Sequence, residues 1–294
     1  MEELFVNTVA GYYAGLMLPR QVRSALRAAR NLGEIIATVT VSKLYEPLSG
    51  SKSLEDAERR LYRIFYDILD EFYSISFGEY KRVVSIITEM HAVKNAIAAL
   101  SAIKRNVPPE KRNLILPVGF LSRDAILAAS VEEFLKRIPE EYRYSNTFEI
   151  FRSYRKRALE ASVGLEVKSM IEKEFEIRAI LLALRGRINK ELSDEISKIL
   201  RVSEKMPLEK IRQILLAETR EDVLNSLSDH RLYEYIKGIE NPYEAYFVIH
   251  ENIPRLVGFS QIPVKPSPRR VYSVLKSLEW EVEKLVSVMN MVVL

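Results

Sequence analysis

The residue types that could do chemistry are few and widely spaced. His91, His230 and His250 are the only histidines, and they are isolated from one another in sequence, so none has a second histidine at the spacing of one helical turn. A bound metal ion or a general base needs partner residues. We therefore expect the histidines to be structural, with no metal site built on them.

Acidic residues are plentiful, and Glu172, Glu174 and Glu176 lie close together. Residues two apart on a helix do not share a face, so this spacing indicates a solvated face and not a catalytic pair of carboxylates. The chain has no cysteine, no glycine-rich phosphate loop ending in Lys-Ser/Thr, no His-Glu-x-x-His pair and no Gly-x-Ser-x-Gly turn. The sequence therefore predicts neither an enzyme nor a bound cofactor.

The segment from Tyr142 to Arg157 mixes aromatic and basic residues. Such a mixture can stack nucleic-acid bases and neutralise phosphates. Phe148 and Phe151 are one helical turn apart, however, which is typical of a buried face with the basic residues turned to water. The net charge of +4, from 44 basic and 40 acidic residues, also favours this second interpretation, because nucleic-acid binders usually carry a larger basic excess.

The elements that would position these residues are helices. The 294 residues include only ten glycines, helix-favouring types dominate, and strict apolar/polar alternation is almost absent. The run Ile35 to Val41 is the one strand candidate, and we prefer a short helix or connector there because no partner strand is in view. The predicted fold class is all-α, and 48% hydrophobic residues are enough for buried cores.

Apolar residues at helical spacing predict a series of helices. Their approximate ranges are 3–17, 19–30, 53–77, 83–105, 144–157, 164–187 and 270–291, with loops expected at 45–51 and 261–269. No window reaches about 18 uninterrupted apolar residues, and the acidic opening Met1-Glu2-Glu3 is unlike a secretory signal. We therefore expect neither a membrane span nor secretion.

The helix at 83–105 and the segment after it recur about 84 residues later. The matched positions are Val93, Ile97, Leu100 and Ile103 with Ile177, Leu181, Leu184 and Arg187; Ile115 to Val118 with Ile199 to Val202; and Leu127 to Leu135 with Leu216 to Leu224. An internal repeat without a catalytic motif is typical of a scaffold of tandem helical modules.

Three pairs of residues have the Ser/Thr-x-x-acid spacing of a helix start. They are Ser53 with Asp56, Ser130 with Glu133, and Thr219 with Asp222. A hydroxyl at such a position accepts a hydrogen bond from an amide of the first turn. We interpret these acids as parts of helix caps and not as a site.

Three sets of residues together form a recognisable order. The first set is Glu89 with Val93-Lys94, Ile115 to Gly119 with Leu121-Ser122, and Leu127 to Leu135; the second is Ile177-Arg178, Ile199-Leu200 and Leu216 to Leu224; the third is Glu281 with Leu285. In this order and spacing the chain resembles the C subunit of archaeal A-type ATP synthases, a relative of the d subunit of the V-type ATPase. The chain departs from that family at Ala92, Glu176 and Lys284, where asparagine is frequent, and at Lys173, where an acid is expected.

The resemblance implies a funnel of three similar helical modules with pseudo-threefold symmetry. The modules would be residues 1–140, residues 141–235 and a shortened third module, 236–294. It also implies a non-catalytic central-rotor subunit, without a cofactor, that couples the central stalk to the membrane ring of proteolipid subunits and transmits torque during ion translocation. The implied partners are central-stalk subunits and that ring, with no nucleic acid. The chain would be present once in the complex, peripheral on the cytoplasmic face of the membrane.

A coupler of this kind needs a polar cavity that holds the end of the stalk. Lys94, Arg178 and Arg185 are on the polar faces of the repeated long helices, and we expect them to line that cavity and contact the partner. The alternative for each residue is an ordinary exposed helix charge. The alternative function for the whole chain is an all-α helical-repeat adaptor that binds protein or nucleic acid.

Overall fold

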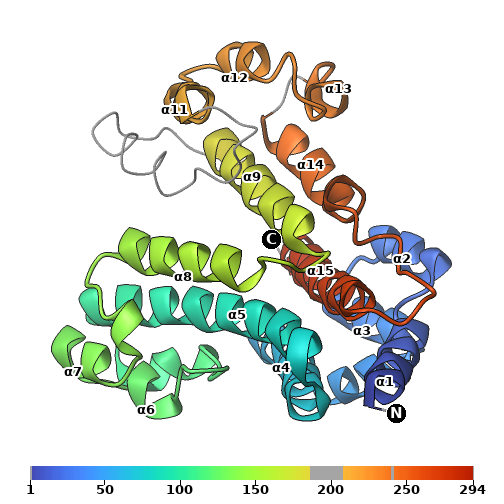
Figure 1. Ribbon diagram of the computed structural model, residues 1–294. Helices are drawn as coiled ribbons and strands as arrows, with labels where there is room; N and C mark the ends of the chain where they lie inside the picture. The colour runs from blue at the N-terminus through green and yellow to red at the C-terminus, as the bar shows by residue number, and fades with distance from the viewer. Residues whose placement is uncertain (1, 186–207, 240–241, 294) are drawn as a thin grey trace. The chain divides into compact units, whose positions relative to one another are not determined.

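The computed structural model describes residues 2–185, 208–239 and 242–293, and these residues form helices joined by short connections (Figure 1). The predicted all-α class is confirmed. By their contacts the helices form two compact units. The first unit is Met1–Thr147 with Ile262–Leu294, and the second is Phe148–Gln261. The three-module division and the funnel symmetry stay predictions.

Three long helices form the core of the first unit. They are α4 (Leu54–Ile75), α5 (Gly78–Lys104) and α15 (Pro268–Val293), and each packs against the other two. α4 begins as predicted after Ser53, whose side-chain oxygen accepts from the backbone N–H of Asp56 at 3.1 Å. The predicted apolar stripe of α15 is buried throughout: Val271, Val274, Leu275, Leu278, Val282, Leu285 and Met289. The end of the chain thus completes a core that begins near residue 54.

Among the described residues α5 is the one helix that is long and apolar enough to cross a membrane. Two thirds of its apolar window, 67%, is buried inside the protein, where α5 contacts α4, α15 and the short helices that follow it. Burial of this kind is typical of the central helix of a packed unit. α5 ends at Lys104, and Pro108 and Pro109 follow soon after, as the sequence predicts.

Short helices precede the core. They are α1 (Glu2–Leu16), α2 (Arg20–Ala25), the 3-10 turn η1 (Leu26–Ala28), α3 (Leu32–Val39) and the 3-10 helix η2 (Lys43–Gly50). The strand candidate at residues 35–41 is therefore mostly the helix α3, which Asn31 caps by accepting from the N–H of Glu34 at 2.9 Å. The loop expected at 45–51 was wrong, because Tyr45 and Leu48 are fully buried and hold η2 in place.

The segment after α5 folds back onto it. It contains η3 (Pro109–Leu114), α6 (Arg123–Ile126), α7 (Val131–Lys136) and η4 (Glu140–Tyr142). A tight turn pairs Val118 with Leu121, and Gly119 in this turn has φ +54°. A Cβ atom at Gly119 would lie 3.0 Å from the side chain of Thr88 on α5, so both the backbone angle and the close approach favour glycine.

The second unit contains α8 (Thr147–Ala161), α9 (Lys168–Arg185), α11 (Leu208–Leu216), α12 (Arg220–Ser226), α13 (Tyr233–Ile236) and α14 (Pro242–Val257). α9 packs against α14, α11 and α12, and Phe175 of α9 contacts the ring of Tyr154 on α8 at 5.9 Å. Our expectation for α8 was partly wrong. Phe148 and Phe151 are only half-buried, whereas Arg155 is buried, with its guanidinium 5.9 Å from the ring of Phe175.

One matched pair of positions begins a helix in the same way in both copies of the repeat. Ser130 caps α7 by accepting from the N–H of Glu133 at 3.2 Å. At the matched position Thr219 caps α12 in the same way, and Asp222 accepts in return from the N–H of Thr219 at 3.1 Å. Arg187 and Ile199 to Val202 lie outside the described residues.

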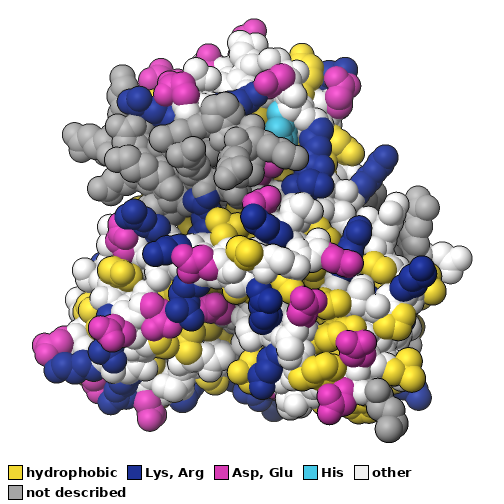
Figure 2. All heavy atoms as spheres, viewed as in Figure 1, with side chains coloured by type: hydrophobic (Ala, Val, Ile, Leu, Met, Phe, Trp, Pro, Cys, Tyr) yellow, Lys and Arg dark blue, Asp and Glu magenta, His cyan; other side chains and the backbone are white. Residues whose placement is uncertain are grey.

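Charges of both signs are interspersed on the face shown in Figure 2. Lys and Arg (dark blue) alternate there with Asp and Glu (magenta), and hydrophobic side chains lie among them. This agrees with the small net charge of +4. On this face neither sign of charge dominates.

The cap of α12 can be tested by Thr219→Ala. The substitution removes the acceptor for the Asp222 amide, and we expect the free energy of unfolding of the second unit to fall by about 1 kcal/mol. Urea unfolding followed by helical circular dichroism measures the change. Ser226→Ala is the matched control in the same helix, because its hydroxyl only donates to the Asp222 carbonyl at 2.8 Å. Equal losses in the two variants would contradict the cap.

Candidate partner-contact site

α15 carries three charged residues in buried positions. Lys276 is 3% exposed, and Glu279 and Glu281 are each 2% exposed. A buried charge is costly unless opposite charges or hydrogen-bond donors surround it. The partners of these three residues therefore determine where α15 can lie in the first unit.

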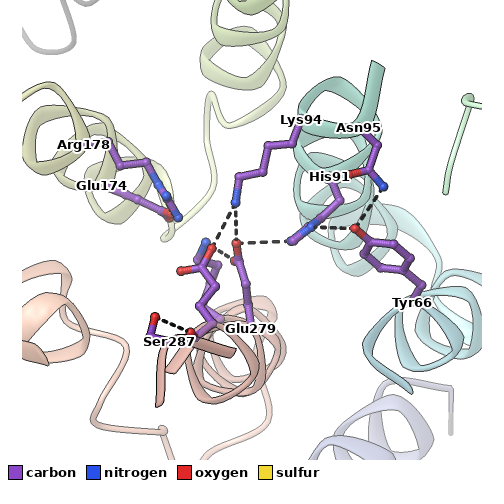
Figure 3. Close-up of polar contacts among 10 residues, drawn as sticks. Tyr66, His91, Lys94, Asn95, Glu174, Arg178, Glu279 and Ser287 are labelled. Atoms are coloured by element: carbon purple, nitrogen blue, oxygen red, sulfur yellow. Dashed lines mark hydrogen bonds and ion pairs between the residues drawn. The ribbon is translucent and has the colours of Figure 1, made fainter. Parts of the chain in front are cut away.

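Glu279 lies at the centre of an ionic cluster between α15 and α5 (Figure 3). Its Oε1 atom is 3.1 Å from the ammonium of Lys94 and 3.2 Å from Nε2 of His91, and its other oxygen accepts from Lys276. Lys94 also lies 3.2 Å from Glu283, one turn further along α15. We call Glu279, Lys276, His91, Lys94 and Glu283 the α5–α15 ion cluster.

His91 enters this cluster as a neutral side chain. Nδ1 of His91 lies 3.5 Å from the hydroxyl of Tyr66 on α4, and that hydroxyl accepts from the amide of Asn95 at 3.2 Å. A neutral imidazole with its proton on Nε2, facing the Glu279 carboxylate, leaves Nδ1 free to accept from Tyr66. The N–H of Nε2 does not point along the line to the carboxylate oxygen, so this contact is mainly electrostatic.

Burial and charge act in opposite directions on the two central groups. Burial lowers the pKa of His91, and this effect outweighs the pull of Glu279 toward the charged form. Burial alone would raise the pKa of Glu279, but Lys276, Lys94 and His91 together hold it well below its usual range. Glu279 is therefore ionised and His91 neutral in the folded protein near neutral pH.

Glu281 anchors the other side of α15. Both of its carboxylate oxygens lie 3.1 Å from the backbone N–H of Leu18, and one accepts from the hydroxyl of Tyr45 at 2.6 Å. Leu18 precedes Pro19 in the connection between α1 and α2, and Tyr45 lies in η2. The Glu281 carboxylate thus ties the helices at residues 2–50 to the last helix of the unit.

Glu89 of α5 has a comparable structural role. It accepts a hydrogen bond from the hydroxyl of Tyr142 in η4, and the ring of Tyr142 stacks on Phe120 with 4.8 Å between centroids. Asn95 donates from the same helix to the backbone oxygen of Leu116 at 2.8 Å. The segment from Leu116 to Tyr142 is therefore fastened to α5 by polar contacts as well as by packing.

The three predicted contact residues belong to different units, Lys94 to the first and Arg178 and Arg185 to the second. Lys94 lies in the α5–α15 ion cluster with 36% of its side chain exposed. Arg178, the matched residue of the second copy, lies in α9 and pairs through Nη2 with Glu174 at 2.8 Å. Arg185 is the last residue of α9, and its side chain lies outside what the structure describes. Lys94 and Arg178 each balance a buried acid on their own unit.

The solvated face expected at Glu172, Glu174 and Glu176 was also partly wrong. Glu174 is buried because Arg178, four residues on, supplies its counter-charge. Glu176 is mostly buried and lies 2.9 Å from Nε2 of His230. Nδ1 of His230 accepts from the backbone N–H of Leu232 at 3.2 Å, so both ring nitrogens are engaged and the pair serves to hold a loop against α9.

In the described ranges, no group of three or more histidine, aspartate or glutamate side chains lies close enough together to hold a metal ion. The carboxylates of Glu89, Glu279 and Glu281 instead hold neighbouring segments of the first unit together. Sequence reasoning missed Lys276 and Glu279. In the sequence, Lys276 and Glu279 differ from ordinary surface charges only in that they interrupt the apolar pattern of the last helix. That pattern alone does not show that the two side chains are buried.

One comparison with known proteins decides the family. The model of the ATP synthase (C/AC39) subunit family matches residues 6–162, which is more than half of the chain. The chain belongs to the ATP synthase (C/AC39) subunit family. The matched range includes Glu89, Lys94 and the Gly119 turn, but not α15 or the second copy of the repeat. No curated protein matches the chain.

Membership makes the chain a subunit of an A- or V-type ATP synthase complex. Subunits of this family are structural and peripheral to a membrane-associated machine. That agrees with an α5 that is buried within its own unit. In this ATP synthase subunit, the α5–α15 ion cluster links the family-matched helices to the last helix of the chain.

Removing the central charge tests the cluster. Glu279→Gln leaves Lys276 buried without its anion, and we expect a loss of about 3–5 kcal/mol in the free energy of unfolding of the first unit. Trp280 is the only tryptophan and is mostly buried in α15, so its fluorescence in a urea titration reports on this unit. Glu132→Gln, which removes an exposed partner of Lys136, is the control and should leave the midpoint unchanged. A similar midpoint for both variants would refute a structural role for the cluster.

The same fluorescence signal should depend on pH. The unfolded chain binds a proton at His91 below pH 6.5, whereas folded His91 stays neutral, so stability falls as pH drops through this range. Below pH 4.5 the unfolded chain also protonates Glu279 while the folded carboxylate stays ionised, which lowers stability further. His91→Gln should therefore flatten the slope of stability between about pH 7 and 5.5. An identical slope in the variant would show that His91 is not the titrating group.

Proposed function

We propose that this chain is the non-catalytic central-rotor subunit of its ATP synthase complex. In this proposal it couples the central stalk to the membrane ring of proteolipid subunits, on the cytoplasmic face of the membrane, and transmits torque during ion translocation. One copy serves each complex. The observation that carries the proposal is the family match over residues 6–162.

Physical features of the first unit support this function. A body that passes torque must resist twisting, and close-packed long helices with few voids deform little. α4, α5 and α15 pack pairwise, and the α5–α15 ion cluster adds charge contacts across one of these interfaces. A component that only transmits force needs no nucleophile and no cofactor, which agrees with a site whose polar residues fasten helices.

The stalk-facing residues in this proposal remain Lys94, Arg178 and Arg185, within a funnel of three modules. The exposed part of Lys94 lies beside the carboxylate of Glu283, which is 20% exposed. Arg178 likewise presents its cation beside Glu174. A partner that contacts Lys94 or Arg178 would therefore meet a cation that is already paired with an acidic side chain. Such contacts contribute specificity and orientation more than affinity.

Isolation of the complex tests the proposal. The chain, carrying an affinity tag, is expressed in its own cells, and the membranes are solubilised in a mild detergent. We expect the tagged chain to purify with stalk and proteolipid subunits, and quantitative mass spectrometry to give one copy per complex. An untagged strain taken through the same steps is the control.

Two outcomes would count against the rotor assignment. A gently isolated complex that holds stalk and ring but lacks this chain would exclude it as the coupler. A chain that instead purifies with a soluble partner, in the absence of membranes, would favour the helical-repeat adaptor. A protein partner and a nucleic-acid partner are then distinguished by nuclease treatment before elution.

A further inference from the structure

The first unit has an apolar groove between the start of α1 and the end of α4. Its volume is about 680 Å³, and its lining residues are Glu2, Leu4, Phe5, Thr8, Ser74, Ile75, Ser76 and Phe77. Leu4 is 64% exposed and Phe5 56%, although both are large apolar side chains. Tyr12 on α1 and Tyr73 on α4 are also exposed. A soluble surface rarely leaves so many neighbouring apolar groups in water without a binding role.

The two helix segments that form this groove carry acidic residues and no basic ones. α1 and the last ten residues of α4, residues 66–75, contain Glu2, Glu3, Asp67, Asp70 and Glu71 but no lysine or arginine. The chain as a whole carries a net charge of +4, so this composition is a local departure. Figure 2 shows hydrophobic side chains over α1 and α4, with acidic side chains and some Lys and Arg side chains among them.

The acids of this surface lie close enough to affect one another. Burial raises the pKa of Asp70, and the neighbouring charge of Asp67 raises it further. Each effect is a cost of keeping the Asp70 carboxylate ionised, and a cation brought to this surface would relieve the repulsion between the two acids. A positively charged group near Asp67 and Asp70 would therefore interact favourably with them.

A cation of the chain itself already lies at the edge of this surface. The ammonium of Lys81, from the first turn of α5, lies over the ring of Tyr73 at 4.4 Å from its centroid. This geometry is the usual one for attraction between a cation and the face of an aromatic ring. The exposed ring of Tyr73 thus combines an apolar surface with an affinity for positive groups.

We propose that this surface, the α1–α4 groove, docks an amphipathic protein segment with basic flanks. Its apolar side chains enter the groove beside Leu4 and Phe5, and its Lys or Arg side chains meet Asp67, Asp70 and Glu71. The recognition is that of a helix or extended segment laid into a hydrophobic groove. Anionic lipid headgroups do not fit, because the same acids repel them. The proposal names only the chemistry of the partner and does not depend on the rotor assignment.

The absence of cysteine from the chain allows a specific test. Phe5→Cys, labelled with a benzophenone maleimide, is assembled into its complex in native membranes and irradiated, and cross-linked peptides are identified by mass spectrometry. Leu114→Cys is the matched control, because Leu114 is 50% exposed in the same unit but outside the groove. We expect Phe5→Cys to give at least fivefold more of one cross-linked peptide, with apolar residues flanked by two or more Lys or Arg.

Neutralising the acids then separates charge from simple exposure. Asp67→Asn with Asp70→Asn, in the Phe5→Cys background, should lower the yield of that peptide at least fivefold. Asp124→Asn with Glu132→Gln, two exposed acids elsewhere in the unit, should leave it unchanged. The proposal would be overturned if Phe5→Cys formed adducts with lipid alone, or with a peptide flanked by acids. It would also be overturned if the yield equalled that of Leu114→Cys, or if the Asp67 and Asp70 changes had no effect on the yield. If one of these contradicting results came from a complex that still contains stalk and ring subunits, the proposed docking surface would be wrong while the rotor assignment would be unaffected.

Discussion

The first unit depends on how the charges of α15 are paired. Residues 271–282 of α15 are nearly all buried, charged side chains included, so apolar burial alone does not determine the rotation of this helix about its axis. Glu279 and Glu281 are two residues apart and therefore point to different sides of the helix. Glu279 needs the cations beside α5, and Glu281 needs the amide of Leu18 and the hydroxyl of Tyr45. Only one rotation of α15 satisfies both acids, because a buried acid without its partners would be strongly unfavourable.

This pairing connects the fold to the proposed work of the protein. The ion contacts join residues 185 positions apart in the chain, at Lys94 and Glu279, so they bind the last helix to the helices matched by the family model. Buried ion pairs often add little net stability compared with apolar packing, but they define which arrangement of helices is allowed. A protein that passes torque benefits from this property, because a single defined arrangement does not slip under load.

The features predicted correctly from the sequence are those that depend on residues close together in the chain. The helix starts at Ser53, Ser130 and Thr219 were found from three-residue spacing, since capping involves only the first turn. The stripes of α4, α5 and α15 were found from their period. The α5–α15 ion cluster was not found, because its partners are distant in sequence. The burial of Glu174 was missed although its counter-charge, Arg178, is only four residues on, because an acid on a helix was taken to be solvated. The burial of Arg155 was missed because its contact with the ring of Phe175 joins two helices that periodicity does not connect.

Hydrogen exchange of backbone amides at neutral pH tests most directly whether charge pairing makes α4, α5 and α15 one cooperative body. Amides that open only in a shared unfolding event exchange with the same free energy. We predict a common, slow exchange limit for the central turns of the three helices, and a selective loss of protection in α15 for Glu281→Gln. Exchange of α15 far faster than that of α4 and α5 in the unaltered chain would contradict the account.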